Sequence, residues 1–174
     1  MKKRALLRWR MLLGVGVLAA LVAPLTATGG GSAKVSTKDD ATQRLADLYR
    51  IDQIEVKFHR ATSKHDLNLM MSLWAPNGTL SLGGKTVKGK PAIRAIFSKA
   101  GPFQPQNKWV SETPAYKIRT TVVGKRATLY FECHYVDVDT GKVVLVNGIS
   151  QDLQKINGKW LITKTVGSSP ILEP

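Results

Sequence analysis

Cysteine is nearly absent from this chain, with one residue, Cys133, among 174. A single cysteine excludes an internal disulfide, and it excludes the zinc and iron–sulfur sites that need several thiolates around one metal centre. A chain of this length buries about two thirds of the surface that it exposes when unfolded, so a hydrophobic core can form without such cross-links. The composition therefore predicts one globular domain preceded by a short segment.

Acidic residues are also scarce, with 12 Asp and Glu against 26 Lys and Arg, a formal net charge of +14. Without residues 1–33, 21 basic residues face the same 12 acids, and the balance is +9. These charges are dispersed, and the longest basic run is the pair Lys125-Arg126. Because no RNA-binding strand signature or zinc-finger spacing accompanies them, we expect no nucleic-acid partner. A solvated basic surface is expected, with weak attraction to an anionic envelope surface as a secondary property.

The chain begins with a cationic segment, residues 1–10, and an uncharged apolar run, residues 11–23, followed by Pro24 and small residues up to Ala33. A helix of 13 residues reaches only about 20 Å, against roughly 30 Å of bilayer hydrocarbon. This order is typical of a secretory signal peptide, which we predict over residues 1–33. The mature protein is then secreted or periplasmic, and the alternative is a membrane anchor formed by an uncleaved N-terminal segment. Export leaves Cys133 either buried or paired with another chain.

The rest of the chain changes from helical to strand periodicity. We predict a linker at residues 34–40, an amphipathic helix over 41–62, a short helix over 67–73 and a third helix opening at Pro91. A short strand at 79–82 and the hairpin turn Gly83-Gly84 precede that third helix. Four β-rich runs follow, at residues 108–123, 126–138, 142–156 and 159–166, and Asn157-Gly158 is the sharpest turn between them. This pattern predicts one α+β domain.

Several pieces of sequence, taken in order, resemble the SnoaL-like branch of the nuclear transport factor 2-like superfamily. They are FHRATSKHDLNLMMSLWAPNGTL at residues 58–80, VKGKPAI at 87–93, and Asp152 followed by Asn157-Gly158-Lys159-Trp160. The resemblance covers residues 41–168 and leaves 169–174 as a C-terminal tail. It implies a cone-shaped, curved antiparallel sheet packed on three N-terminal helices and enclosing a cavity, often closed by dimerisation. Such cavities serve isomerases, dehydratases, cyclases, epoxide hydrolases and proteins without catalysis, so the resemblance implies no single activity.

The ketosteroid isomerases of this superfamily provide a residue-by-residue test. Their helix tyrosine falls on Phe58 here, and their general-base aspartate falls on Leu82, so neither role is carried over. Their deep acid falls on Asp152, and the family's common Tyr-x-Asp pair reads Ser150-Gln151-Asp152. With two of three groups missing, the resemblance does not imply that isomerase reaction.

The densest group of reactive side chains lies on the run 126–138. Alternation along a strand puts Tyr130, Glu132 and His134 on one face, with Glu132 and His134 roughly 7 Å apart. If that face lines the cavity, His134, Glu132 and Asp152 are the candidate catalytic residues for acid–base chemistry. If Phe131, Cys133 and Tyr135 point inward instead, Glu132 and His134 lie in solvent or at a dimer contact. We predict no metal site, because no ligand spacing supports one.

Three functions therefore stay open. The first is an exported domain that binds a small apolar ligand without a cofactor. The second is a cofactor-independent isomerase or lyase, and the third is a non-catalytic assembly module of an envelope complex. A homodimer is compatible with each of them. The candidate ligand pocket consists mainly of aromatic residues at positions that the resemblance places near the cavity: Phe58, His59, Trp74, Leu82, Trp109, Tyr116, Tyr130 and Ser150.

Overall fold

The computed structural model describes residues 38–172 of the chain. The predicted signal peptide, residues 1–33, lies outside the described residues. Within residues 38–172 no helix combines the length and the apolar character needed to cross a bilayer.

Three α-helices precede the longest strands of the sheet. They are α1 (Lys38–Ser63), α2 (Leu67–Ser72) and α3 (Lys90–Phe97), and two short 3₁₀ turns, η1 (Gly101–Phe103) and η2 (Ala115–Lys117), follow. In α1 the residues Ile51, Ile54, Phe58 and Ala61 recur at three- and four-residue steps, and all are buried. Asp66 caps α2 by accepting a hydrogen bond from the Leu69 amide at 2.8 Å. The predicted three-helix arrangement is therefore confirmed.

Seven strands form one curved sheet. They are β1 (Trp74–Leu82), β2 (Lys85–Lys88), β3 (Trp109–Glu112), β4 (Arg119–Val123), β5 (Arg126–Asp137), β6 (Val143–Ile156) and β7 (Lys159–Leu172). Their order is β2-β1-β7-β6-β5-β3, and β4 also pairs with β5. All pairs are antiparallel except β1 with β7, so the sheet is mixed and not wholly antiparallel as the resemblance implied. The predicted α+β class, with three helices packed on a curved sheet, is confirmed.

Some boundaries differ from the predicted ones. Residues 108–123 were predicted as one run, but they form β3, η2 and β4. The chain leaves the sheet at Pro114, which has no amide hydrogen to donate to a strand ladder. At the two ends, α1 begins at Lys38, inside the predicted linker, and β7 continues to Leu172, inside the predicted tail.

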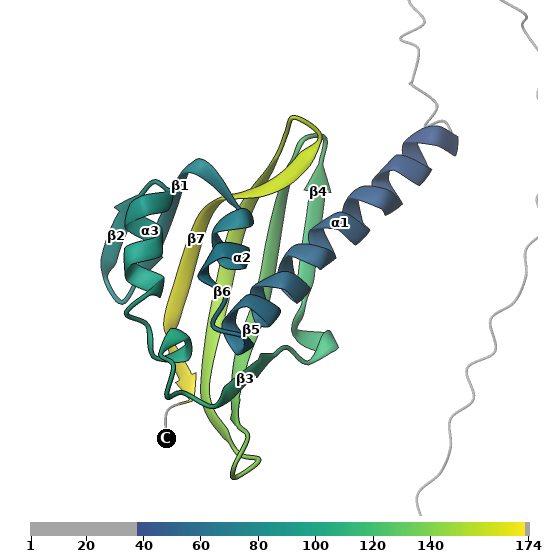
Figure 1. The fold of residues 1–174 in the computed structure, drawn as a ribbon. Helices are drawn as coiled ribbons and strands as arrows, with labels where there is room; N and C mark the ends of the chain where they lie inside the picture. The colour runs from purple at the N-terminus through teal and green to yellow at the C-terminus, as the bar shows by residue number, and fades with distance from the viewer. Residues whose placement is uncertain (1–37, 173–174) are drawn as a thin grey trace, which may run out of the picture. The chain divides into compact units, whose positions relative to one another are not determined.

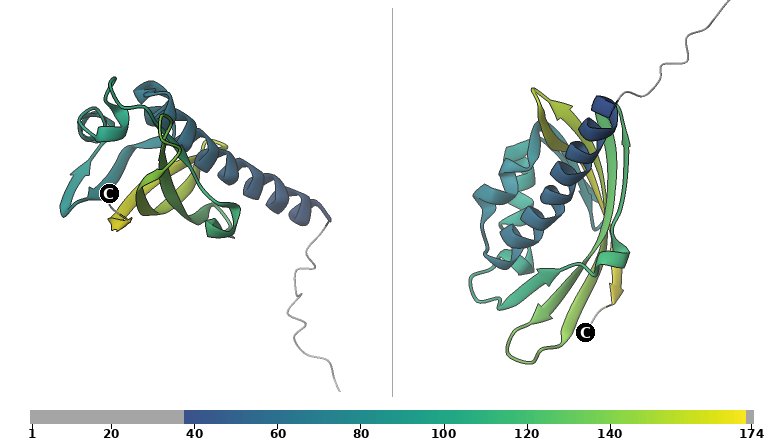
Figure 2. Two further views of the ribbon diagram at one scale, coloured as in Figure 1. Left: turned by 90° about the horizontal axis from the view of Figure 1, so that it is seen from below. Right: turned by 90° about the vertical axis from the view of Figure 1, so that its right-hand side faces the viewer.

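All three helices lie on one face of the sheet, and α1 crosses it diagonally (Figures 1 and 2). From β5, this helix-covered inner face receives Leu129, Phe131, Cys133 and Tyr135, all buried. The ring of Phe58 on α1 meets Phe131 edge to face, with centroids 5.3 Å apart. Burial leaves Cys133 fully enclosed and raises the pKa of its thiol to about 12. Of the two outcomes open for Cys133, the structure therefore shows the buried one.

Candidate functional site

The inner face is not filled completely. A cavity of about 120 Å³ lies between α1, α3 and η1 on one side and strands β1, β5, β6 and β7 on the other. Phe58, Phe97 and Phe103 line its helical side, and Leu82 and Ile149 are among the apolar residues on the sheet side. Gly167 of β7 also lines it, and a Cβ there would lie 2.5 Å from Leu82 Cδ1, so this position accepts no larger residue without movement of Leu82.

The cavity lining is poor in groups that transfer protons. Among the described residues that line it, none is an acid, a histidine or a lysine, and Thr62, Asn147 and Thr165 contribute polar groups. Tyr135 also lines the cavity, but burial raises the pKa of its hydroxyl well above the usual value. The described lining of the cavity is therefore uncharged and mainly apolar.

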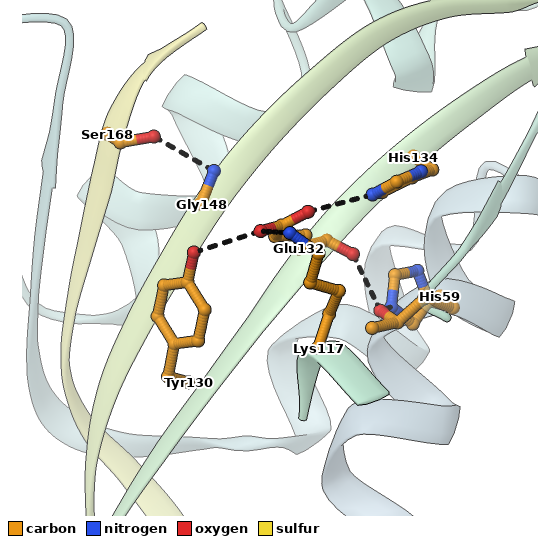
Figure 3. A network of polar contacts seen from close by, with 8 residues as sticks. His59, Lys117, Tyr130, Glu132, His134, Gly148 and Ser168 are labelled. Carbon is orange, nitrogen blue, oxygen red and sulfur yellow. Dashed lines mark hydrogen bonds and ion pairs between the residues drawn. The ribbon is translucent and has the colours of Figure 1, made fainter. Parts of the chain in front are cut away.

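Glu132 and His134 lie on the opposite, outer face of the sheet. The Glu132 carboxylate accepts hydrogen bonds from His134 Nε2 and from Lys117 Nζ, each at 3.0 Å, and from the Tyr130 hydroxyl at 3.4 Å (Figure 3). The bond from His134 and then the bond from Lys117 lower the pKa of Glu132, so it is a carboxylate at neutral pH. Of the two orientations left open, the structure shows the one in which Phe131, Cys133 and Tyr135 point inward.

Asp152 does not join this pair. It lies directly opposite Thr128, four residues along β5 from Glu132, which corresponds to about 13 Å. Its side chain is exposed on the outer face, and the inward side chain of this segment belongs to its neighbour Gln151, which is 2% exposed. The alignment implied by the resemblance is therefore off by one residue in β6. The polar side chain beneath the helices is the amide of Gln151 and not the carboxylate of Asp152.

The predicted pocket residues separate into three places. Phe58 and Leu82 line the cavity. Trp74 and Trp109 pack in or against the core, where their rings contact Phe97 and Tyr135. Tyr130 and Ser150 lie opposite each other on the outer face, and Tyr116 is 78% exposed on η2.

His59, the last predicted pocket residue, belongs to a buried polar cluster that was not among the predicted sites. Its Nε2 lies 3.0 Å from the Glu55 carboxylate, and its Nδ1 lies 2.6 Å from Ser111 Oγ on β3. Its Nε2 also contacts Thr113 Oγ1, which donates to the Glu132 carbonyl at 2.7 Å. The four-residue spacing of Glu55 and His59 was the available signal. The cluster does not line the cavity, and it ties α1 to the edge of the sheet.

A metal site has no support in the described part of the chain, where no group of three or more His, Cys, Asp or Glu residues is placed to hold an ion.

Comparison with known proteins gives a family but no activity. The model of the SnoaL-like domain family matches residues 43–166, and no curated protein matches the chain. Solved structures with the same fold include a protein of unknown function with a cystatin-like fold from Nostoc punctiforme. It has 18% sequence identity and a TM-score of 0.64, and the match covers 74% of this chain and 95% of that one.

Two further relatives carry provisional enzyme names. One is a candidate dehydratase of the nuclear transport factor 2-like family from Streptomyces avermitilis, with 12% identity, a TM-score of 0.61, and coverage of 73% of this chain and 98% of that one. The other is a candidate ketosteroid isomerase from Shewanella frigidimarina, with 17% identity, a TM-score of 0.55, and coverage of 67% and 92%. At these identities the likeness concerns the fold. The family match extends over most of the described residues, and the chain belongs to the SnoaL-like domain family.

Proposed function

We propose that this protein is an exported, cofactor-independent binding protein that holds a small, uncharged, mainly apolar molecule in the cavity beneath α1. The observation that carries the proposal is the lining of the cavity, where aromatic and aliphatic side chains surround about 120 Å³ and, among the described residues, no charged group is present. An apolar guest in such a space gains by leaving water, and it finds close contacts with the phenylalanine rings.

Binding is favoured over the isomerase or lyase alternative. The reactions named for two of the structural relatives need a group that moves a proton at the bound molecule. In this chain Glu132 and His134 lie on the outer face, separated from the cavity by the sheet itself. Among the described residues lining the cavity, the one titratable side chain is Tyr135, whose pKa is raised.

Toluene provides a direct test of the proposal, because it is apolar and small enough for a cavity of this size. In a methyl-detected NMR titration, the resonances of Leu82 and Ile149 should shift saturably in the wild-type protein. Leu82→Trp should abolish the shift of the Ile149 resonance by filling the cavity from a half-buried position. Val56→Trp, on the exposed face of α1, is the matched control and should bind as the wild type does. Toluene binding that survives Leu82→Trp, or no saturable binding at all, would refute the proposed site.

The outer face of the sheet supports a second proposal, self-association, which is compatible with each of the three functions. Apolar side chains are exposed on this face or beside it: Tyr116 at 78%, Val123 at 73% and Val166 at 39%. In the antiparallel register, Val123 lies opposite Arg126 and Val166 lies opposite Ser150, so both strand residues share the face of Tyr130 and Glu132. We propose that this face pairs with a second copy of the chain.

A further inference from the structure

Four described residues, His65, Trp74, Gln151 and Thr165, have a buried side-chain nitrogen or oxygen without a hydrogen-bond partner, and two of the four lie opposite each other on neighbouring strands of the inner face. These two are Thr165, whose hydroxyl is unpaired, and Gln151, whose amide oxygen and nitrogen are both unpaired. Their exposed fractions are 1% and 2%, so bulk water does not reach them. Burying a polar group without a partner is unfavourable, and native proteins mostly avoid it. Two such residues side by side leave hydrogen-bonding capacity that a buried water or a group of a bound molecule can complete.

One of the two residues lines the cavity on its sheet side, and the other is its direct neighbour on the adjacent strand. Thr165 of β7 is one of the residues that line it. Gln151 of β6 lies directly opposite Thr165 in the antiparallel register, which places their Cβ atoms about 5 Å apart on the same face. Gln151 is therefore the inward-facing neighbour of Thr165, next to the lining but not part of it, and the described lining around Thr165 is largely apolar.

Thr62, another polar residue of the lining, does have a hydrogen-bond partner. Its hydroxyl donates to the Phe58 carbonyl at 2.9 Å, within its own helix. On the helical side, Phe58, Phe97 and Phe103 present ring surfaces to the cavity. The free hydrogen-bonding capacity is thus concentrated on the β6–β7 side, opposite the aromatic side.

We infer that Thr165 and Gln151 form a polar subsite and that the ligand is a neutral amphipathic molecule, with an apolar ring or chain and one hydroxyl or carbonyl group. This inference rests on the proposed function of the cavity as a binding site. The Thr165 hydroxyl and the Gln151 amide can both donate and accept, which suits a hydroxyl in either role and a carbonyl as acceptor. A carboxylate or an ammonium group would stay unpaired, because no residue of opposite charge is present among the described residues of the lining.

Phenol and toluene test the inference as a matched pair, since a hydroxyl in one replaces a methyl in the other. Dissociation constants for both are measured by NMR titration in the wild type and in Thr165→Val and Gln151→Met, which remove the polar groups at nearly constant volume. In each variant the dissociation constant for phenol, divided by that for toluene, should rise about five-fold or more. A five-fold change corresponds to the free energy of about one ordinary hydrogen bond. Thr62→Val, at a polar lining residue already bonded within α1, is the control and should leave the ratio unchanged.

The other outcomes separate this inference from the proposed function. If both compounds bind and the ratio stays constant in Thr165→Val and Gln151→Met, the polar subsite is refuted and the cavity remains a binding site. If neither compound shifts the cavity methyls, both proposals fail. The melting temperatures of the ligand-free variants should equal or exceed that of the wild type, because each substitution removes an unpaired buried group. A clear fall in both would show that the two groups already have partners in the free protein, and it would overturn the inference.

Discussion

Asp47 is the residue whose ionisation contributes most clearly to stability. Burial alone would raise the pKa of this carboxyl group, but hydrogen bonds from Lys155, Trp160 and Gln43, together with the charge of Lys155, outweigh burial and lower the pKa to about 2. Lys155 Nζ lies 2.8 Å and 3.0 Å from the two carboxylate oxygens, and the Trp160 indole donates at 3.0 Å. Asp47 on α1 thereby fixes the hairpin between β6 and β7.

The stabilisation by Asp47 should disappear in acid. Because the pKa is lower in the folded state than the ordinary value of 3.8, this contribution is fully present above about pH 5 and is lost as the pH falls towards 2. Urea unfolding should therefore show Asp47→Asn to be about 2 kcal/mol less stable than the wild type at pH 7, with about half that difference at pH 3. Asp52→Asn, at an exposed acid on the same helix, should stay within about 0.5 kcal/mol of the wild type throughout. If the free energy of unfolding of Asp47→Asn differs from that of the wild type by the same amount at pH 7 and pH 3, the ionised Asp47 carboxylate is not the source of this stability.

At the residue scale the sequence predicted side-chain types better than their orientation. Phe58 and Leu82 were expected at the cavity, and both line it. The faces of β5 could not be assigned from alternation alone, since Tyr130 on one face and Tyr135 on the other are equally aromatic. Asp152 was a candidate because the deep acid of the ketosteroid isomerases falls on it, whereas the pleat of β6 turns the neighbouring Gln151 inward.

At the element scale the main feature is the connection between α1 and β3. Glu55 and His59 of α1 are buried together, and His59 contacts Ser111 and Thr113 from the edge of the sheet. Ser63 adds a further tie, because its Oγ accepts from the Ser111 amide at 2.8 Å. These contacts hold α1 across β3, beside the helical wall of the cavity.

Removing the His59 side chain should destabilise the fold, because it leaves the Glu55 carboxylate buried without its partner. We expect His59→Leu to lower the free energy of unfolding by about 3–5 kcal/mol in urea titrations. The double variant Glu55→Leu/His59→Leu should recover most of that loss, since both members of the pair are then apolar and Leu suits a helix. If the double variant is less stable than His59→Leu alone, the pair is not coupled in this way.

The elements themselves were largely predictable, since their signals are local. Asn157 and Gly158 adopt positive φ angles of 48° and 77°, as a tight hairpin turn requires of this dipeptide. The parallel pairing of β1 with β7 could not be predicted, because it joins segments about 85 residues apart and depends on how the whole sheet curves. The break at Pro114 had a signal in the sequence, but the β-rich residues on both sides concealed it.

At the scale of the whole molecule, the outer face of the sheet predicts self-association. Light scattering of the purified protein at micromolar concentration should give the mass of a dimer, with Val166→Lys shifting it towards a monomer by placing a charge in the contact. Val56→Lys, on the solvent face of α1, is the control and should leave the dimer intact. A stable interface needs roughly 800 Å² from each partner. A monomer mass for the wild type would rule out this dimer.

The cavity beneath α1 is the feature on which the proposed function depends, and xenon tests it most directly. Xenon enters apolar cavities of this size and is located in a crystal by its strong scattering. Crystals of the protein pressurised with xenon should show an atom among Phe58, Leu82 and Phe103, and crystals of Leu82→Trp should show none there. A wild-type crystal without xenon at this position, with the three side chains packed against one another, would contradict the account.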